Sequence, residues 1–232
     1  MNRSIIWAMI FAAGASLWAG DIASYVDLGF SQDGTVYMFG QYGVQAGTLR
    51  PWADLFVVDV PKNDFVNGGK LSYVHDAPVS AGQNGAGALY RLIARNAALA
   101  ERYGVGYLLH GHPLYIALDA GGSAPAAGEA IEFRDFNARY TYRAQLISSI
   151  EGGGANLASS FYIILEQTGA DGSKKTFPQV GNPQIKRPLI SSYRIRKVMI
   201  APLERSIIFV IEMRKQSSDG LDIRYMVEAL RL

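Results

Sequence analysis

The sequence predicts a mainly β protein of packed antiparallel sheets, arranged as a sandwich or as partial-propeller-like meanders, with one inserted helix. Three observations predict this class. Apolar and polar residues alternate over residues 136–150, which is the period of a strand with one buried face. Short β-branched and aromatic runs recur along the chain, with Asp-Gly and Gly-Gly turns between them. Only residues 88–102 carry apolar side chains at helical spacing.

Residues 1–19 have the organisation of a secretory signal peptide. Arg3 supplies a positive charge, residues 5–15 form a short apolar run, and Ala19-Gly20 offers a cleavage site of small residues. Residues 13–15 are an alternative cleavage site, and an uncleaved anchor is the competing interpretation, although the run is short for a membrane-spanning helix. We therefore expect a periplasmic or secreted protein with no transmembrane anchor after cleavage, in which residues 20–232 form a single mainly β domain.

A three-stranded unit occurs near each end of the chain. Residues 25–60 predict a strand, a tight Asp-Gly turn, a second strand, a polar loop and a third strand at residues 53–60. Residues 195–229 repeat this order, and Phe39 of the first unit aligns with Phe209 of the second. Such self-similarity predicts two related antiparallel meanders.

The middle of the chain contains the predicted helix and a loop. Leu89, Leu92 and Leu99 lie at helical spacing within residues 88–102, and Gly104 provides a stop signal. Residues 119–130 are rich in Gly, Ala and Ser, which predicts an exposed loop or a weak linker.

The pattern of the second half of the chain predicts strands. On residues 136–150 the face predicted to be buried contains Phe136, Ala138, Tyr140, Tyr142, Ala144, Leu146 and Ile150. Further strands are predicted at residues 157–167, 194–200, 206–213 and 222–229.

Two resemblances add to this interpretation. The segment GFSQDGTVYMFG, followed by ADLFVVDV, is similar to the repeat of TolB-type β-propellers. Over nearly the whole mature chain, LGFSQDGTVYMFGQYGVQ, VVDV, IAPLERSIIFVIEM and IRYMVEA together resemble a bacterial family of predicted secreted proteins, domain of unknown function 2259. That resemblance implies secretion and a β-rich body, and it carries no activity or catalytic residue.

Composition excludes several classes of site and partner. The chain has no cysteine, so it has no disulfide, no thiolate metal site and no lipid anchor on a cysteine. Its 22 basic and 20 acidic side chains are nearly balanced, unlike those of a nucleic-acid-binding protein. We expect no cofactor.

One basic surface is a candidate binding site. Residues 131–200 carry an excess of basic side chains, among them Arg139, Arg143, Arg194, Arg196 and Lys197. If these five meet on one sheet, they would attract an anionic envelope polymer or an acidic partner. The alternative is that they protect exposed strand edges from pairing.

His110 and His112 are weak candidates for a metal site. Alternate residues on a strand share a face, so both imidazoles could reach one ion. Zinc needs further ligands, and only His75 or Asp119 is near in sequence. A polar strand end before Pro113 is the simpler interpretation.

These observations favour an exported, non-catalytic binding or scaffold protein of the cell envelope. Its expected partner is an envelope protein or an anionic envelope polymer, and nucleic acid is not expected. No nucleophile motif is present, and no catalytic residue is assigned. The alternative is an envelope hydrolase with an unrecognised site around His110 and His112.

Overall fold

The computed structural model describes residues 20–118, 128, 130–217 and 220–232. The predicted signal peptide and most of the predicted loop at residues 119–130 lie outside these residues. The described chain forms three antiparallel sheets and two α-helices, which confirms the predicted mainly β class.

The N-terminal sheet contains β1 (Ser24–Phe30), β2 (Val36–Val44), β3 (Pro51–Asp59) and β4 (Asp64–Val74), in chain order. Its first three strands are the predicted N-terminal meander. Every neighbouring pair is antiparallel, as short connections between consecutive strands allow.

The central sheet has the order β13 (Gly220–Arg231), β12 (Ser206–Ser217), β11 (Ile190–Ile200) and β5 (His112–Ile116). β11, β12 and β13 form the second predicted meander, which is also confirmed. The 3-10 turn η2 (Pro202–Glu204) joins β11 to β12.

The outer sheet has the order β10 (Arg187–Pro188), β8 (Ala158–Thr168), β7 (Tyr140–Glu151) and β6 (Ala130–Asp135), and β9 (Lys174–Thr176) also pairs with β8. The 3-10 turn η1 (Gly154–Asn156) lies between β7 and β8.

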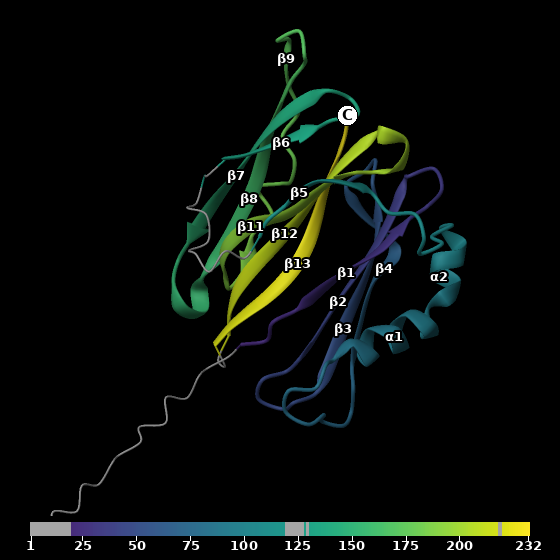
Figure 1. Cartoon of the computed structure of the whole chain (residues 1–232). Helices are drawn as coiled ribbons and strands as arrows, with labels where there is room; N and C mark the ends of the chain where they lie inside the picture. Colours follow the sequence, from purple (N-terminus) through teal and green to yellow (C-terminus); the bar gives the residue numbers. More distant parts are fainter. Residues whose placement is uncertain (1–19, 119–127, 129, 218–219) are drawn as a thin grey trace, which may run out of the picture.

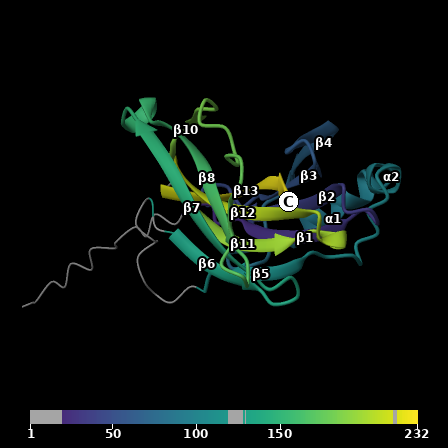
Figure 2. The same ribbon diagram turned by 90° about the horizontal axis from the view of Figure 1, so that it is seen from above.

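The sheets are stacked in layers, with the central sheet between the other two (Figures 1 and 2). One apolar core joins the outer and central sheets, and a second joins the central and N-terminal sheets. A third core lies beneath α1 (Ala86–Arg95) and α2 (Ala97–Arg102), which cover the other face of the N-terminal sheet. β12 is therefore buried on both faces, which explains its unbroken apolar run IIFVI at residues 207–211.

This arrangement is a stacked sandwich, and it does not support the propeller resemblance. Propeller blades radiate around a central channel. Here the two meanders belong to sheets that pack face to face and share an apolar core.

The prediction of one continuous helix at residues 88–102 is wrong, because the helix is divided at Asn96. This residue has φ −121° and ψ 25°, and its side-chain amide donates to the Leu92 carbonyl oxygen at 2.8 Å. The helix interrupts itself there because an asparagine side chain competes with the backbone for hydrogen bonds. α1 still presents the predicted apolar side chains Leu89 and Leu92 to the N-terminal sheet.

The long strand predicted at residues 136–150 begins four residues later than expected. Asp135 Oδ1 accepts hydrogen bonds from the backbone N–H groups of Asn137 and Ala138, at 2.9 and 3.0 Å, and so holds a turn. Phe136 is consequently 77% exposed instead of buried. Within β7 the predicted alternation is confirmed for Tyr142, Ala144 and Leu146, which are buried. It is wrong at the two ends of the strand, where Tyr140 and Ile150 are 38% and 49% exposed.

The Asp-Gly turn between β1 and β2 is a contact point between two sheets. Gly34 has φ +68°, and a Cβ atom there would lie 2.5 Å from the Pro202 carbonyl oxygen in η2. Gly172 has φ +81° in another Asp-Gly turn, but a Cβ atom there would meet nothing within 4 Å.

These two glycines form a matched pair for mutation. Gly172→Ala should cost about 1–2 kcal/mol, because only the left-handed backbone conformation is unfavourable. Gly34→Ala should cost at least about 1 kcal/mol more, because the methyl group also overpacks the contact with Pro202. Urea unfolding of both variants measures the difference. Equal losses of unfolding free energy would show that the contact with Pro202 can accommodate the methyl group without cost.

Candidate ligand-binding cleft

A cleft of about 890 Å³ follows β13, the edge strand of the central sheet. One wall is the N-terminal sheet with its β3–β4 turn, and the opposite wall is the segment of residues 179–190 that includes β10. Figure 2 shows β13 between these two parts of the molecule. The cleft exists because both neighbouring layers extend past the same edge of the central sheet.

The N-terminal wall carries a row of aromatic rings. Phe39 of β2, Phe56 of β3 and Phe65 of β4 are neighbours, with ring centroids 4.8 and 5.7 Å apart. Phe39 and Phe56 are opposite each other in the β2–β3 register, so strand pairing places them on one face. Phe39 is buried, whereas Phe56 and Phe65 are half-buried, so the row emerges from the core into the cleft.

The opposite wall and the floor add aliphatic surface. Ile185 is 52% exposed, and Pro188 is also exposed beside it in the same segment. Met213 of β12 and Met226 of β13 are half-buried on the floor. The cleft is thus predominantly apolar, which is typical of sites for small organic ligands.

Glu228 marks one end of the cleft and is buried on β13. Asn63 of the β3–β4 turn donates to Glu228 Oε2 at 2.5 Å, and its Oδ1 accepts from the Ala229 backbone N–H at 2.6 Å. Arg187 Nη2 lies 3.7 Å from Glu228 Oε1. Burial raises the pKa of the Glu228 carboxyl, against the opposing effects of Asn63 and Arg187.

The raised pKa of Glu228 predicts a pH dependence of stability. The folded state holds the Glu228 proton more tightly than the unfolded state, in which the pKa of this carboxyl is near 4.5. The stability that the bound proton contributes is therefore present below that pH. It is lost as the pH rises through the folded-state pKa. Glu228→Gln cannot ionise, so its free energy of unfolding should fall less than that of the wild type over this range. Glu166→Gln, at a half-exposed position of β8, is the control. Parallel pH profiles for the wild type and Glu228→Gln would contradict the prediction.

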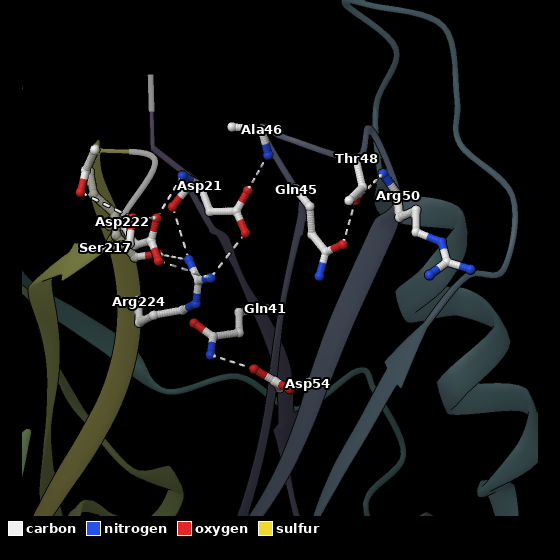
Figure 3. Close-up of polar contacts among 12 residues, drawn as sticks. Asp21, Gln41, Gln45, Ala46, Thr48, Arg50, Asp54, Ser217, Asp222 and Arg224 are labelled. Carbon is white, nitrogen blue, oxygen red and sulfur yellow. Dashed lines mark hydrogen bonds and ion pairs between the residues drawn. The ribbon is translucent and has the colours of Figure 1, made fainter. Parts of the chain in front are cut away.

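Arg224 forms a polar cluster at the other end of β13 (Figure 3). Its guanidinium donates to the Asp21 carbonyl oxygen at 2.9 Å and to Asp21 Oδ2 at 3.2 Å, and it lies 3.7 Å from Asp222 Oδ2. It also lies 4.1 Å from the Trp52 ring centroid. Burial and the neighbouring Asp222 raise the pKa of Asp21, whereas Arg224 lowers it. This cluster ties the start of the described chain to the central sheet.

Side chains also bond to the free edge of β13. Gln41 Oε1 accepts from the Tyr225 backbone N–H at 2.8 Å, and Gln41 Nε2 donates to Asp54 Oδ2 at 2.9 Å (Figure 3 shows the latter pair). Asn63 Oδ1 likewise accepts from the Ala229 backbone N–H. These bonds occupy edge groups that could otherwise pair with another strand. The cleft therefore offers a ligand its side-chain surface more than its backbone edge.

A family model described as "Predicted secreted protein (DUF2259)" matches residues 38–231. The chain belongs to this family. Its description fits the periplasmic or secreted location expected from residues 1–19, and it confirms the resemblance drawn from the sequence. A comparison with curated proteins found no match. Among the described residues of this DUF2259 protein, no helix is long and apolar enough to cross a membrane.

The structure does not bring the five predicted basic residues of this DUF2259 protein onto one sheet. Arg139 lies in the β6–β7 turn, and Arg143 of β7 lies 3.7 Å from Glu166 Oε2, both in the outer sheet. Arg194, Arg196 and Lys197 belong to β11 in the central sheet. Arg196 Nε lies 3.5 Å from Glu212 Oε2, and Lys197 Nζ lies 3.0 Å from Asp27 Oδ2. Anion binding by these residues stays a prediction.

The two predicted histidines lie close together but have different surroundings. His110 precedes β5, and its Nδ1 lies 3.1 Å from Asp27 Oδ1. His112 is the exposed first residue of β5. The third histidine, His75, bonds to the Tyr73 hydroxyl at 3.0 Å. No three His, Asp or Glu side chains of the described residues are grouped to hold a metal ion. Asp119, the other ligand considered, lies outside the described residues.

Asp27 is a polar centre that the sequence interpretation missed. Its carboxylate meets His110 from the loop before β5 and Lys197 from β11. Beside it, the Tyr25 and Tyr37 hydroxyl groups contact each other in the core. Burial raises the pKa of both tyrosines, so both stay protonated. No sequence signal links Asp27 to His110 or Lys197, because both partners lie far along the chain from β1.

Proposed function

We propose that this protein is a non-catalytic binding protein of the cell envelope, with its ligand in the cleft along β13. The observation that carries the proposal is the cleft itself. Its volume of about 890 Å³ lies within the range typical of small-molecule sites, about 300–1,000 Å³. Its lining combines half-buried aromatic side chains and aliphatic side chains with a few fixed polar groups.

The carboxylates in the cleft support recognition more than catalysis. Asp54 accepts from Gln41 and from the Ser72 hydroxyl, at 2.9 and 2.7 Å. Glu228 is held by Asn63 and Arg187. A general acid or base must exchange a proton with its substrate, whereas groups held in this way orient a ligand and shape its site.

Binding of a neutral apolar fluorophore, N-phenyl-1-naphthylamine, tests the proposal on the protein that begins at Gly20. Ile185→Glu places a charge on an exposed apolar wall residue, and it should weaken binding by about tenfold or more because the probe then faces a carboxylate. Ile150→Glu is the matched control, because Ile150 is similarly exposed, at 49%, on β7 and does not line the cleft. Equal affinities of the wild type and Ile185→Glu would refute the cleft as the site.

The alternative function is an envelope hydrolase around His110 and His112. The Asp27–His110 contact favours it, because a carboxylate commonly orients a catalytic imidazole. Such an enzyme also needs a nucleophile on the second ring nitrogen, and among the described residues His110 Nε2 has no hydrogen-bonded hydroxyl group. Loss of an ester- or amide-cleaving activity in a folded His110→Ala variant would establish this alternative.

A further inference from the structure

We infer that cleavage of the signal peptide between Ala19 and Gly20 creates an ammonium group that completes the charged cluster around Arg224. Hydrolysis of this peptide bond by a signal peptidase consumes one water molecule and leaves a carboxylate on Ala19 and an amine on Gly20. That amine is protonated at neutral pH. Cleavage therefore supplies a cation at the point where residues 20–23 meet the central sheet.

The cluster has more negative than positive charge among the described residues (Figure 3). Arg224 Nη2 lies 3.2 Å from Asp21 Oδ2 and 3.7 Å from Asp222 Oδ2, so one guanidinium serves two carboxylates. The side chains of Asp21 and Asp222 are only 13% and 12% exposed. Lys215 is opposite Asp222 in the β12–β13 register, but no described carboxylate lies within 4.0 Å of its ammonium group.

Two further observations show that the carboxylate pair is incompletely compensated. Burial and the charge of Asp222 raise the pKa of Asp21, although Arg224 lowers it. A polar pocket of about 240 Å³ adjoins the pair, and its lining consists of Asp21, Asp222 and five uncharged residues. An additional cation beside this pocket would therefore stabilise both carboxylates.

The backbone holds Gly20 against these carboxylates. The Asp21 N–H donates to Asp222 Oδ1 at 2.9 Å, and the Ile223 N–H donates to the Asp21 carbonyl oxygen at 2.8 Å. A Cβ atom on Gly20 would lie 2.2 Å from the Leu221 carbonyl oxygen, so only glycine permits this approach. Because nitrogens of consecutive residues are at most about 3.7 Å apart, the Gly20 nitrogen lies within about 7 Å of Asp222 Oδ1.

An ammonium group at this distance interacts with the cluster. The Debye length is about 8 Å at physiological ionic strength, and screening is weaker still for largely buried carboxylates. Before cleavage the same nitrogen belongs to a neutral peptide group. Residues 20–23 pair with the free edge of β13, where the Ala23 N–H donates to the Ile223 carbonyl oxygen at 3.1 Å. The new charge thus strengthens the connection between the start of the mature chain and the central sheet.

Thermal unfolding of two versions of the protein tests the inference. The version that begins at Gly20 should melt about 2–4 °C above the version that begins at Ala19. The extra residue converts the Gly20 amine into a neutral peptide group and moves the charged amine about 3.8 Å along the chain.

Variants of the cluster locate the effect. Asp222→Asn retains an oxygen that can accept from the Asp21 N–H, and it should remove most of the difference between the two versions. Glu166→Gln is the matched control, because Glu166 Oε2 also lies 3.7 Å from an arginine, Arg143, but belongs to the outer sheet. It should leave the difference unchanged.

The difference should also depend on pH. The carboxylates raise the pKa of the Gly20 amine in the folded protein, so its stabilisation is present at neutral pH and is lost as the pH rises through that pKa. The charged groups that face the amine are Asp21, Asp222 and Arg224, which keep their charge in this range, and Lys215, which both versions share. The two melting temperatures should therefore be closer at about pH 10 than at about pH 7.

Mass spectrometry of the protein exported by cells that express residues 1–232 checks the cleavage site. A first residue other than Gly20 would overturn the inference. Equal melting temperatures of the two versions would overturn it as well, and so would a difference that persists unchanged in Asp222→Asn. If Glu166→Gln removes the difference as Asp222→Asn does, the effect is one of overall charge and the inference fails.

Discussion

Phe209→Ala is expected to lower the free energy of unfolding by about 3–5 kcal/mol. Phe209 is the fourth residue of β12, is 0% exposed and belongs to the core between the central and outer sheets. β12 is paired on both edges and covered on both faces, so its neighbours have little freedom to close the cavity. Urea unfolding followed by circular dichroism measures the loss.

The control for Phe209 is an aromatic residue outside the cores. Tyr90 of α1 is 67% exposed, so Tyr90→Ala should change the free energy of unfolding by no more than about 0.5 kcal/mol. A loss below about 1 kcal/mol for Phe209→Ala would mean that the sheets can repack around the missing ring, contrary to a close-packed double-faced core.

Separating Asp27 from Lys197 is expected to cause the second large loss. Lys197→Met leaves the Asp27 carboxylate, whose side chain is only 15% exposed, without its closest cation. Breaking one side of a largely buried ion pair costs about 3 kcal/mol, because the remaining charge stays desolvated. Asp27→Asn should cost a similar amount, since Lys197 then lacks a counter-charge and His110 lacks its carboxylate.

A double-mutant cycle tests whether the two residues act as a pair. The double variant Asp27→Asn, Lys197→Met should be less destabilised than the sum of the single variants, by about 1–3 kcal/mol. The same cycle on Glu151 and Lys186 is the comparison, and it should show little coupling because that ion pair is exposed. Additive losses at Asp27 and Lys197 would show that the contact contributes no specific stabilisation.

Strand prediction succeeded where neighbouring residues carry the information. The alternation of Tyr142, Ala144 and Leu146 is local, and these residues face the core as expected. β4 was not predicted, because Asn67-Gly68-Gly69 interrupts it with turn residues. In the fold these residues lie within β4, at a shift in its register with β3 between Phe56 and Val58. Pairing with β3 holds the strand together across the glycines.

Prediction of a site from the sequence was less successful, because the residues of a site come from segments that are far apart in the chain. The basic residues of 131–200 are close in sequence, yet they belong to two sheets, and several pair with carboxylates from other strands. The cleft combines Phe56 and Phe65 from one wall, Ile185 from another, and Lys215 and Glu228 from the central sheet. None of these five shares a motif with another.

By itself, the sequence determined the family, the mainly β class, and the three-stranded meanders near the two ends of the described chain, and it predicts an export signal at residues 1–19. Each of these follows from local composition, period or turn chemistry. Only the tertiary structure decided that the meanders pack face to face, that Asp27 meets Lys197, and that a cleft follows β13. The physical reason is that sheet stacking depends on contacts between residues far apart in the chain, and a period-two pattern says which face is buried but not what covers it.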